Sequence, residues 1–162
     1  MRSSKHNLLT ALILKPDWLN LHLTPNWPAP AHVKAVFTTL QGGVSVAPFG
    51  TLNLGDHVGD RAELVAINRN HLAQAIGAQP IYLKQVHGTD VVTLDANTPD
   101  GTVADACITT HRDVACTIMV ADCLPVLFTD SDGTFVAAAH AGWRGLAAGV
   151  LQHTLDQMYM KN

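Results

Sequence analysis

The sequence is short of charge and of long apolar runs, and both shortages narrow what the protein can be. Charged residues make up only 14% of the 162 residues, against 48% hydrophobic ones, a low ratio for a small soluble monomer. This ratio predicts either that the chain associates as a homo-oligomer or that part of its surface cover is missing. No segment approaches the roughly 20 apolar residues that a spanning helix needs, so the sequence predicts no membrane partner.

Positive charge and cysteine are also sparse. Ten lysines and arginines against 13 acidic residues give a net charge of −3, and no basic stripe suggests nucleic acid as a partner. The three cysteines, Cys107, Cys116 and Cys123, are odd in number and lack the spacing of a disulfide scaffold, which favours a reducing compartment. The apolar run at residues 8–14 is followed by no cleavage signal. We interpret it as an N-terminal extension and predict a cytoplasmic protein.

Apolar runs of strand length alternate with segments of helical spacing, which predicts an α/β fold. The most regular helix begins near Asp60, whose spacing to Glu63 matches a capping box, and ends at Gly77. Strands are predicted at 33–38, 81–86, 90–94, 103–109, 114–120 and 134–139, and a second helix at 143–160. The length predicts a single domain over residues 1–162, of which 1–32 are a proline-interrupted, irregular extension and 40–59 a long glycine-rich loop.

Three reactive side chains follow strand-like runs. His87, Cys123 and His140 each come just after one of the predicted strands. Open α/β sheets place ligand sites at the ends of strands, so we expect the three side chains to converge. Two imidazoles and one thiolate match a zinc site with an open fourth position, although no local metal motif supports it. Spacing alone also leaves open a Cys–His thiol catalyst, or a core cysteine near two hydrogen-bonded histidines.

The start of the second helix adds a candidate anion site. Free backbone amides at residues 142–145, together with the guanidinium of Arg144, suit a phosphate or a carboxylate. The alternative is that Trp143 anchors the core and Arg144 is an exposed residue at the start of the helix. The glycine pair at 42–43 offers further backbone amides, and His57 is a second-tier candidate.

Six segments together resemble one known family. They are GGVSVAPFGTLNLGDHVGD (42–60), NRNHL (68–72), QVHG (85–88), ADA (104–106), ADCLPVLF (121–128) and AAHAGWRGL (138–146). From about residue 33 to the end, the chain is similar to the YfiH-like, laccase-domain family. This resemblance implies a mixed-sheet α/β sandwich, C-terminally truncated because members continue for about another third of their length. Leu40 stands where members usually carry an arginine.

The resemblance also implies a site. His87, Cys123 and His140 correspond to the metal-binding residues, with zinc or copper as the metal, and they are our candidate catalytic residues. Candidate substrate contacts are Arg144, Asn53, Gly43 and Asp122.

The implied activity is a metal-dependent purine nucleoside phosphorylase that also deaminates adenosine. Candidate substrates are adenosine, inosine and methylthioadenosine, with phosphate. Three alternatives stay open: a Cys–His hydrolase acting on a cell-wall precursor, a copper polyphenol oxidase, and an inactive fragment. The oxidase is disfavoured because none of the nine histidines forms the His-x-His pair common in multicopper sites.

Overall fold

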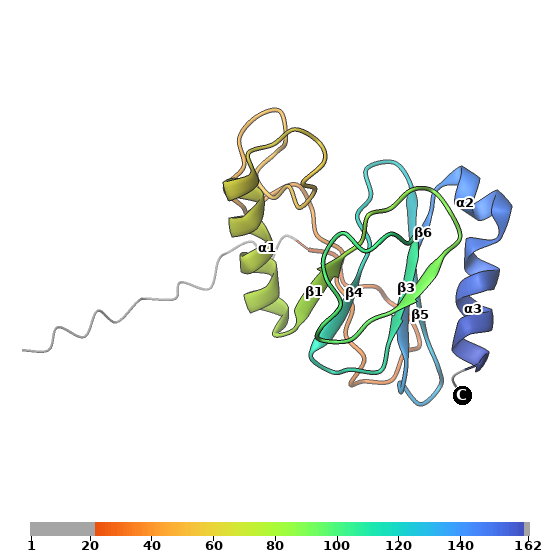
Figure 1. Ribbon diagram of the computed structural model, residues 1–162. Helices are drawn as coiled ribbons and strands as arrows, with labels where there is room; N and C mark the ends of the chain where they lie inside the picture. Colours follow the sequence, from red (N-terminus) through yellow and green to blue (C-terminus); the bar gives the residue numbers. More distant parts are fainter. Residues whose placement is uncertain (1–21, 161–162) are drawn as a thin grey trace, which may run out of the picture.

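The computed structural model describes residues 22–160 (Figure 1). The segment predicted at 8–14, like the rest of 1–21, lies outside the described residues. Residues 22–32 contain no helix, and their one ladder contact is an isolated bridge between Leu23 and Phe37. The strand predicted at 33–38 is therefore wrong. Because this segment has no neighbouring strand in the described chain beyond that single bridge, its apolar side chains are not covered, and Phe37 is 42% exposed.

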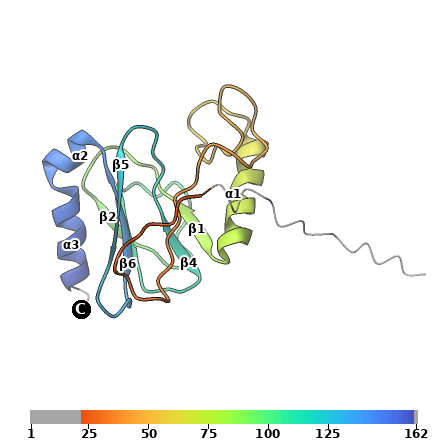
Figure 2. The same ribbon diagram turned by 180° about the vertical axis from the view of Figure 1, so that it is seen from behind.

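The described chain forms four layers, with helices outside two sheets (Figures 1 and 2). α1 (Ala62–Ile76) packs on β1 (Gln79–Tyr82), which pairs in parallel with β4 (Val114–Thr117). The second sheet has the order β2 (Val91–Thr93), β3 (Ala106–Thr109), β6 (Val136–Ala141) and β5 (Leu124–Thr129). The outer face of this sheet contacts α3 (Val150–Met160). The predicted mixed-sheet α/β sandwich is confirmed, since β2–β3 is parallel and the other pairs of this sheet are antiparallel.

The alanine-rich β6 lies at the centre of the packing because its side chains alternate between two faces. Ala138 packs toward the two-stranded sheet with Ile81, whereas Ala139 packs toward α3 with Val150. Small side chains on both faces let the neighbouring layers approach closely. His140 is on the same face of β6 as Ala138 and is therefore directed between the sheets.

The predicted helix at 60–77 is confirmed, except for the hydrogen bonds at its N-terminus. It ends at Gly77 in the left-handed conformation, at φ 67°, as expected. The capping box does not form, because the Asp60 carboxylate accepts hydrogen bonds from Ser45 and Asn53 of the preceding loop. The residues that α1 buries most deeply are Val65, Asn68 and Leu72.

Two other elements differ from the prediction. β5 was not predicted from the sequence, because Pro125 interrupts its pattern. In the structure β5 lies at a sheet edge, where proline is tolerated. The helix predicted at 143–160 is two helices, α2 (Trp143–Ala148) and α3, divided by Gly149 at φ 95°. No helix in the described part of the chain is both long and apolar enough to cross a bilayer.

Candidate metal centre

The structure brings together the three reactive side chains that the sequence singled out. The ligand atoms of His87, Cys123 and His140 all lie within 4.8 Å of one another. The Cys123 Sγ is 3.7 Å from His87 Nε2. The two imidazole rings meet edge to face, with 4.7 Å between their centroids and 72° between their planes. The predicted convergence is confirmed, although its route through the fold differs from the expected one.

The cluster is not built from the carboxyl ends of parallel strands. His140 lies inside β6, and Cys123 comes just before β5, the antiparallel neighbour of β6. Leu124 pairs with Ala141, so the start of one strand meets the end of the other. Gly142 closes this corner: a Cβ there would lie 2.8 Å from His87 Cδ2 and 3.0 Å from Cys123 Sγ. The antiparallel hairpin and the glycine therefore create the space that the three side chains share.

His87 has an unusual backbone conformation. Among the described residues it is the one non-glycine residue with positive φ, at 60°, a conformation that persists only where its surroundings enforce it. The enforcing group is the carboxylate of Asp105, which accepts hydrogen bonds from the backbone amides of Val86, His87 and Gly88 at 3.1, 2.8 and 2.7 Å. The left-handed turn aims these consecutive amides at one acceptor.

Asp105 also contacts the second histidine. Its Oδ1 lies 2.9 Å from His140 Nδ1, and the Asp105 side chain is completely buried. Burial raises the pKa of Asp105, but the hydrogen bonds from His140 and from the three amides outweigh burial and hold that pKa below its usual value. An ionised carboxylate only accepts hydrogen bonds, so His140 Nδ1 is the donor in this contact, and in a neutral imidazole Nε2 is then the acceptor.

Asp105 is the central residue of the ADA segment at 104–106, but no pattern in the sequence predicted a role for it. The available signal was a single acidic residue within the apolar stretch 103–109. Acidic residues are almost never fully buried unless they are paired. A carboxylate in a predicted buried strand therefore indicates a specific partner, but the sequence does not say which one.

Cys123 is poorly suited to act alone as a nucleophile. Burial raises the pKa of its thiol, and the neighbouring Asp122 carboxylate raises it further through its charge and a 3.6 Å hydrogen bond. A reactive thiolate requires a nearby cation or a similar source of positive potential. A metal ion between the three side chains would supply that charge.

The three side chains fit a zinc ion. With Zn–N distances of about 2.0–2.1 Å and Zn–S of about 2.3 Å, tetrahedral ligand atoms lie roughly 3.3–3.7 Å apart. The observed Sγ to Nε2 distance of 3.7 Å is at that spacing, and the wider limit of 4.8 Å on the three separations means that the ligands would draw closer around an ion. The Asp105–His140 pair is the carboxylate–histidine arrangement that orients metal-bound imidazoles. The donor set therefore suits a metal with one coordination position left open.

The four candidate substrate contacts lie in two different places. Arg144 and Asp122 are exposed residues close in sequence to the cluster. The Arg144 guanidinium lies 4.5 Å from the centre of the Trp143 ring. Trp143 itself is 71% exposed, so its alternative interpretation as a core anchor is wrong.

Gly43 and Asn53 belong to the loop at 40–59, which lies beside α1 on the opposite side of the molecule from α2 (Figures 1 and 2). Their recorded contacts are structural. The Asn53 carboxamide bonds within its own turn and to Asp60. A Cβ on Gly43 would collide with Asn68 Oδ1 and the Thr51 carbonyl. In the described chain, Gly43 and Asn53 therefore contact the loop and α1, whereas Arg144 and Asp122 are close in sequence to the cluster.

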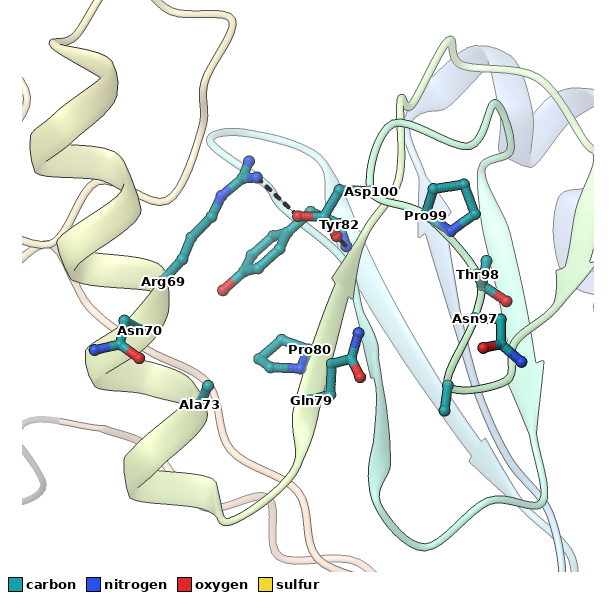
Figure 3. Close-up of a pocket in the computed structure, with 11 residues that line it drawn as sticks. Arg69, Asn70, Ala73, Gln79, Pro80, Tyr82, Asn97, Thr98, Pro99 and Asp100 are labelled. Atoms are coloured by element: carbon teal, nitrogen blue, oxygen red, sulfur yellow. Dashed lines mark hydrogen bonds and ion pairs between the residues drawn. The ribbon is translucent and has the colours of Figure 1, made fainter.

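A groove of about 470 Å³ lies elsewhere, between α1, β1 and the turn before Gly101 (Figure 3). On its wall, the Arg69 guanidinium lies 4.0 Å from the centre of the Tyr82 ring and 3.3 Å from an Asp100 carboxylate oxygen. None of the three candidate ligands lines this groove. Arg69 links α1 to β1 and to the turn, which gives it a structural role apart from the cluster.

The chain matches one family model and is similar to several named proteins. The sequence model of a family described as "Multi-copper polyphenol oxidoreductase laccase" matches residues 34–162. A Pseudomonas aeruginosa protein named purine nucleoside phosphorylase is 55% identical over 141 residues, which are 86% of this chain and 57% of that protein. The Escherichia coli purine nucleoside phosphorylase YfiH is 47% identical over 136 residues, covering 83% of this chain and 56% of its own length. The chain thus spans little more than half the length of these relatives.

Solved structures show the same fold. A Neisseria meningitidis protein superposes with a TM-score of 0.79 at 53% identity, covering 85% of this chain and 57% of its own. YlmD from Geobacillus stearothermophilus gives a TM-score of 0.71 at 32% identity, covering 82% and 54%.

Proposed function

The chain belongs to the multi-copper polyphenol oxidoreductase laccase family of YfiH-like proteins, and we propose that it is a metal-dependent purine nucleoside phosphorylase. The observation that carries the proposal is the convergence of His87, Cys123 and His140 in a chain whose relatives are named purine nucleoside phosphorylases. The substrates in this proposal are a purine nucleoside and phosphate. Adenosine, inosine and methylthioadenosine are the candidate nucleosides, and deamination of adenosine is a second candidate activity.

In this proposal the metal is zinc, with copper as the alternative, held by His87 Nε2, Cys123 Sγ and His140 Nε2. A bound zinc ion supplies a Lewis acid. The chain does the rest: Asp105 keeps the proton on His140 Nδ1, and Gly142 leaves the shared space free of a side chain. His87 and His140 meet edge to face, so each ring limits the rotation of the other.

Two exposed residues near the cluster in sequence are the proposed substrate contacts. We assign phosphate to Arg144 for two reasons. A guanidinium is a strong charge-assisted donor, and Arg144 follows Gly142, which lines the cluster, by two residues. Asp122 is adjacent to Cys123 and faces solvent, so it is assigned to the rim of the site. Substrate roles for Asn53 and Gly43 stay predictions from the sequence, since their contacts in the structure hold the loop.

Product analysis tests the proposed activity. The purified chain is incubated with adenosine, with and without phosphate, and the products are separated by chromatography beside those of the Pseudomonas aeruginosa relative. Adenine that appears only with phosphate is the expected result, and inosine would indicate deamination. If the relative forms adenine or inosine and this chain forms neither of the two, the 162-residue chain does not have the proposed activity.

A Cys–His hydrolase is the second candidate, because Cys123 Sγ lies 3.7 Å from His87 Nε2. In this alternative the base is His87, the histidine whose Nε2 contacts the thiol. Alkylation separates the two candidates: a metal-bound thiolate reacts slowly until a chelator is added, whereas a free nucleophile reacts quickly in metal-free protein. Residues 22–160 hold one His/Cys/Asp/Glu cluster with metal-site geometry, which gives no support to a multicopper oxidase.

A further inference from the structure

We propose that Asp105 is the positioning residue for both histidine ligands at once, acting on His140 through its imidazole and on His87 through the main chain. The proposal rests on the metal site of the proposed function. It adds that the two ligands are not placed independently: one buried carboxylate couples them.

The coupling is visible in how the carboxylate is used. Oδ1 lies 2.9 Å from His140 Nδ1 and accepts the His87 amide at 2.8 Å. Oδ2 accepts the amides of Val86 and Gly88 at 3.1 and 2.7 Å. A carboxylate offers about four acceptor positions, and all four are occupied. Asp105 therefore has no free lone pair for a metal or a substrate proton, and its role is positional.

The bond to His140 and the three amide bonds fix different things: the first fixes the His140 ring, and the others fix the backbone of His87. The bond to Nδ1 selects the tautomer of His140 and directs Nε2 toward the cluster. The three amide bonds stabilise the left-handed backbone of His87, which a residue with a Cβ adopts only where its surroundings enforce it. This backbone turn decides where the His87 ring lies. Loss of the carboxylate should thus release one ring and relax the backbone under the other.

Asp105→Asn is the informative change because it keeps the size of the side chain. One oxygen is replaced by an NH₂ group, which cannot accept from an amide or from Nδ1–H. At least one pair of the present contacts is therefore lost whichever way the amide turns. The main chain of Asp105 still accepts the His140 amide at 2.7 Å, so one β3–β6 link is retained. Asp130→Asn is a matched control, since the Asp130 carboxylate also accepts a backbone amide, that of Phe135, at 2.9 Å.

The first experiment measures zinc and cobalt affinity by competition with a chelator in the wild-type chain and both variants. Asp105→Asn should bind each metal about 10–100-fold more weakly, and the absorption spectrum of its cobalt form should change shape as well as intensity. Asp130→Asn should leave affinity and spectrum unchanged. Wild-type affinity in Asp105→Asn, or an equal loss in Asp130→Asn, would overturn the proposal.

A double-mutant comparison tests the coupling. In the His87→Ala background, Asp105→Asn should still weaken metal binding, through His140, but by a smaller factor than in the wild-type chain. An equal factor in both backgrounds would mean that Asp105 acts through His140 alone, and no effect in the His87→Ala background would mean that it acts through His87 alone. Either result contradicts a shared role.

A measurement without metal separates this proposal from the proposed function. Long-range ¹H–¹⁵N spectra of the metal-free wild-type chain should show His140 with its proton on Nδ1. The Nε2–H tautomer would overturn the role of Asp105 even if Asp105→Asn fails to fold. If the wild-type chain binds neither zinc nor cobalt, the metal-dependent function fails, whereas the tautomer still decides the positioning role.

Discussion

Two buried polar residues, Asn68 and Asp105, each organise a loop, and only one of them lies beneath a candidate site. Both side chains are fully buried. Asn68 holds the 40–59 loop: its Oδ1 accepts the Val44 amide at 2.9 Å, and its Nδ2 donates to Ser45 Oγ and to the carbonyls of Thr51 and Asn53. Asp105 holds residues 86–88 and His140.

The two networks differ in what they leave unused. The hydrogen bonds of Asn68 connect α1 to neutral groups of the loop, namely the Ser45 hydroxyl and the main chain of Val44, Thr51 and Asn53. The bonds of Asp105 hold two imidazoles whose remaining nitrogen atoms lie near a thiol. Burial of a polar side chain therefore does not by itself indicate a functional site. What indicates one is that the groups held in place direct unsatisfied ligand atoms into a common space.

The largest expected effect is on metal content when a ligand is removed. His87→Ala, Cys123→Ala and His140→Ala should each lose most bound zinc, by more than the roughly 10–100-fold that a change behind a ligand costs. Asn68→Ala should keep its zinc if the two networks are independent. Elemental analysis after dialysis measures both. Full zinc occupancy in Cys123→Ala would contradict the metal centre and leave the thiol hydrolase as the better function.

Asn68→Ala should instead reduce stability. The change leaves the Val44 amide and several loop acceptors without their partner, and such losses cost about 1–3 kcal/mol per buried group. We expect the free energy of unfolding in urea to fall by about 3 kcal/mol. Asn70→Ala, at an exposed position of the same helix, is the control and should change little. If the two variants are equally stable, the Asn68 network does not hold the loop.

The loop network also predicts a dependence on pH. Hydrogen bonds from Ser45 and Asn53 lower the pKa of Asp60 from its usual value. A carboxyl with a lower pKa in the folded state stabilises the protein above its unfolded pKa, and this contribution is lost as the pH falls through the folded pKa. Between pH 6 and pH 3, the wild-type chain should therefore lose more stability than Asp60→Asn. Parallel losses measured by urea unfolding would show that these bonds do not favour the ionised form.

The smallest expected effect is that of Arg144→Ala. The side chain is exposed and lies over Trp143, and contacts of an exposed charge are weakened by water and salt. We expect the KM for phosphate to rise by up to about tenfold, with unchanged zinc content. Arg112→Ala, at an exposed arginine in the turn before β4, is the control. A KM for phosphate that does not change in Arg144→Ala would remove this residue from the site.

The first helix and the family membership can be predicted from short stretches of sequence. α1 follows from the helical spacing after Asp60 and from Gly77, which adopts the left-handed conformation that ends the helix. The family membership follows from short motifs that contain His87, Cys123 and His140. These motifs give the identity of the candidate ligands because the donor atoms belong to the residue types themselves.

Pairing between distant segments was decided only by the tertiary structure. β5 could not be predicted because Pro125 disrupts its local pattern. It forms in the structure because it lies at a sheet edge, where a proline is tolerated. The division between α2 and α3 depends on one residue, Gly149, at positive φ. β5 is stabilised by pairing with β6, which is a tertiary contact. The break between the helices depends on the backbone angle of Gly149, which cannot be read from composition.

The donor atoms of this protein, two imidazoles and a thiol near strands, follow from residue types that can be identified without a structure. Only the tertiary structure determined how they are held, because Asp105 acts across 35 residues of sequence to reach His140 and through a strained backbone to reach His87. A carboxylate becomes a positioning group when folding removes it from water and surrounds it with donors. Its partners are therefore a property of the folded chain and not of any local motif.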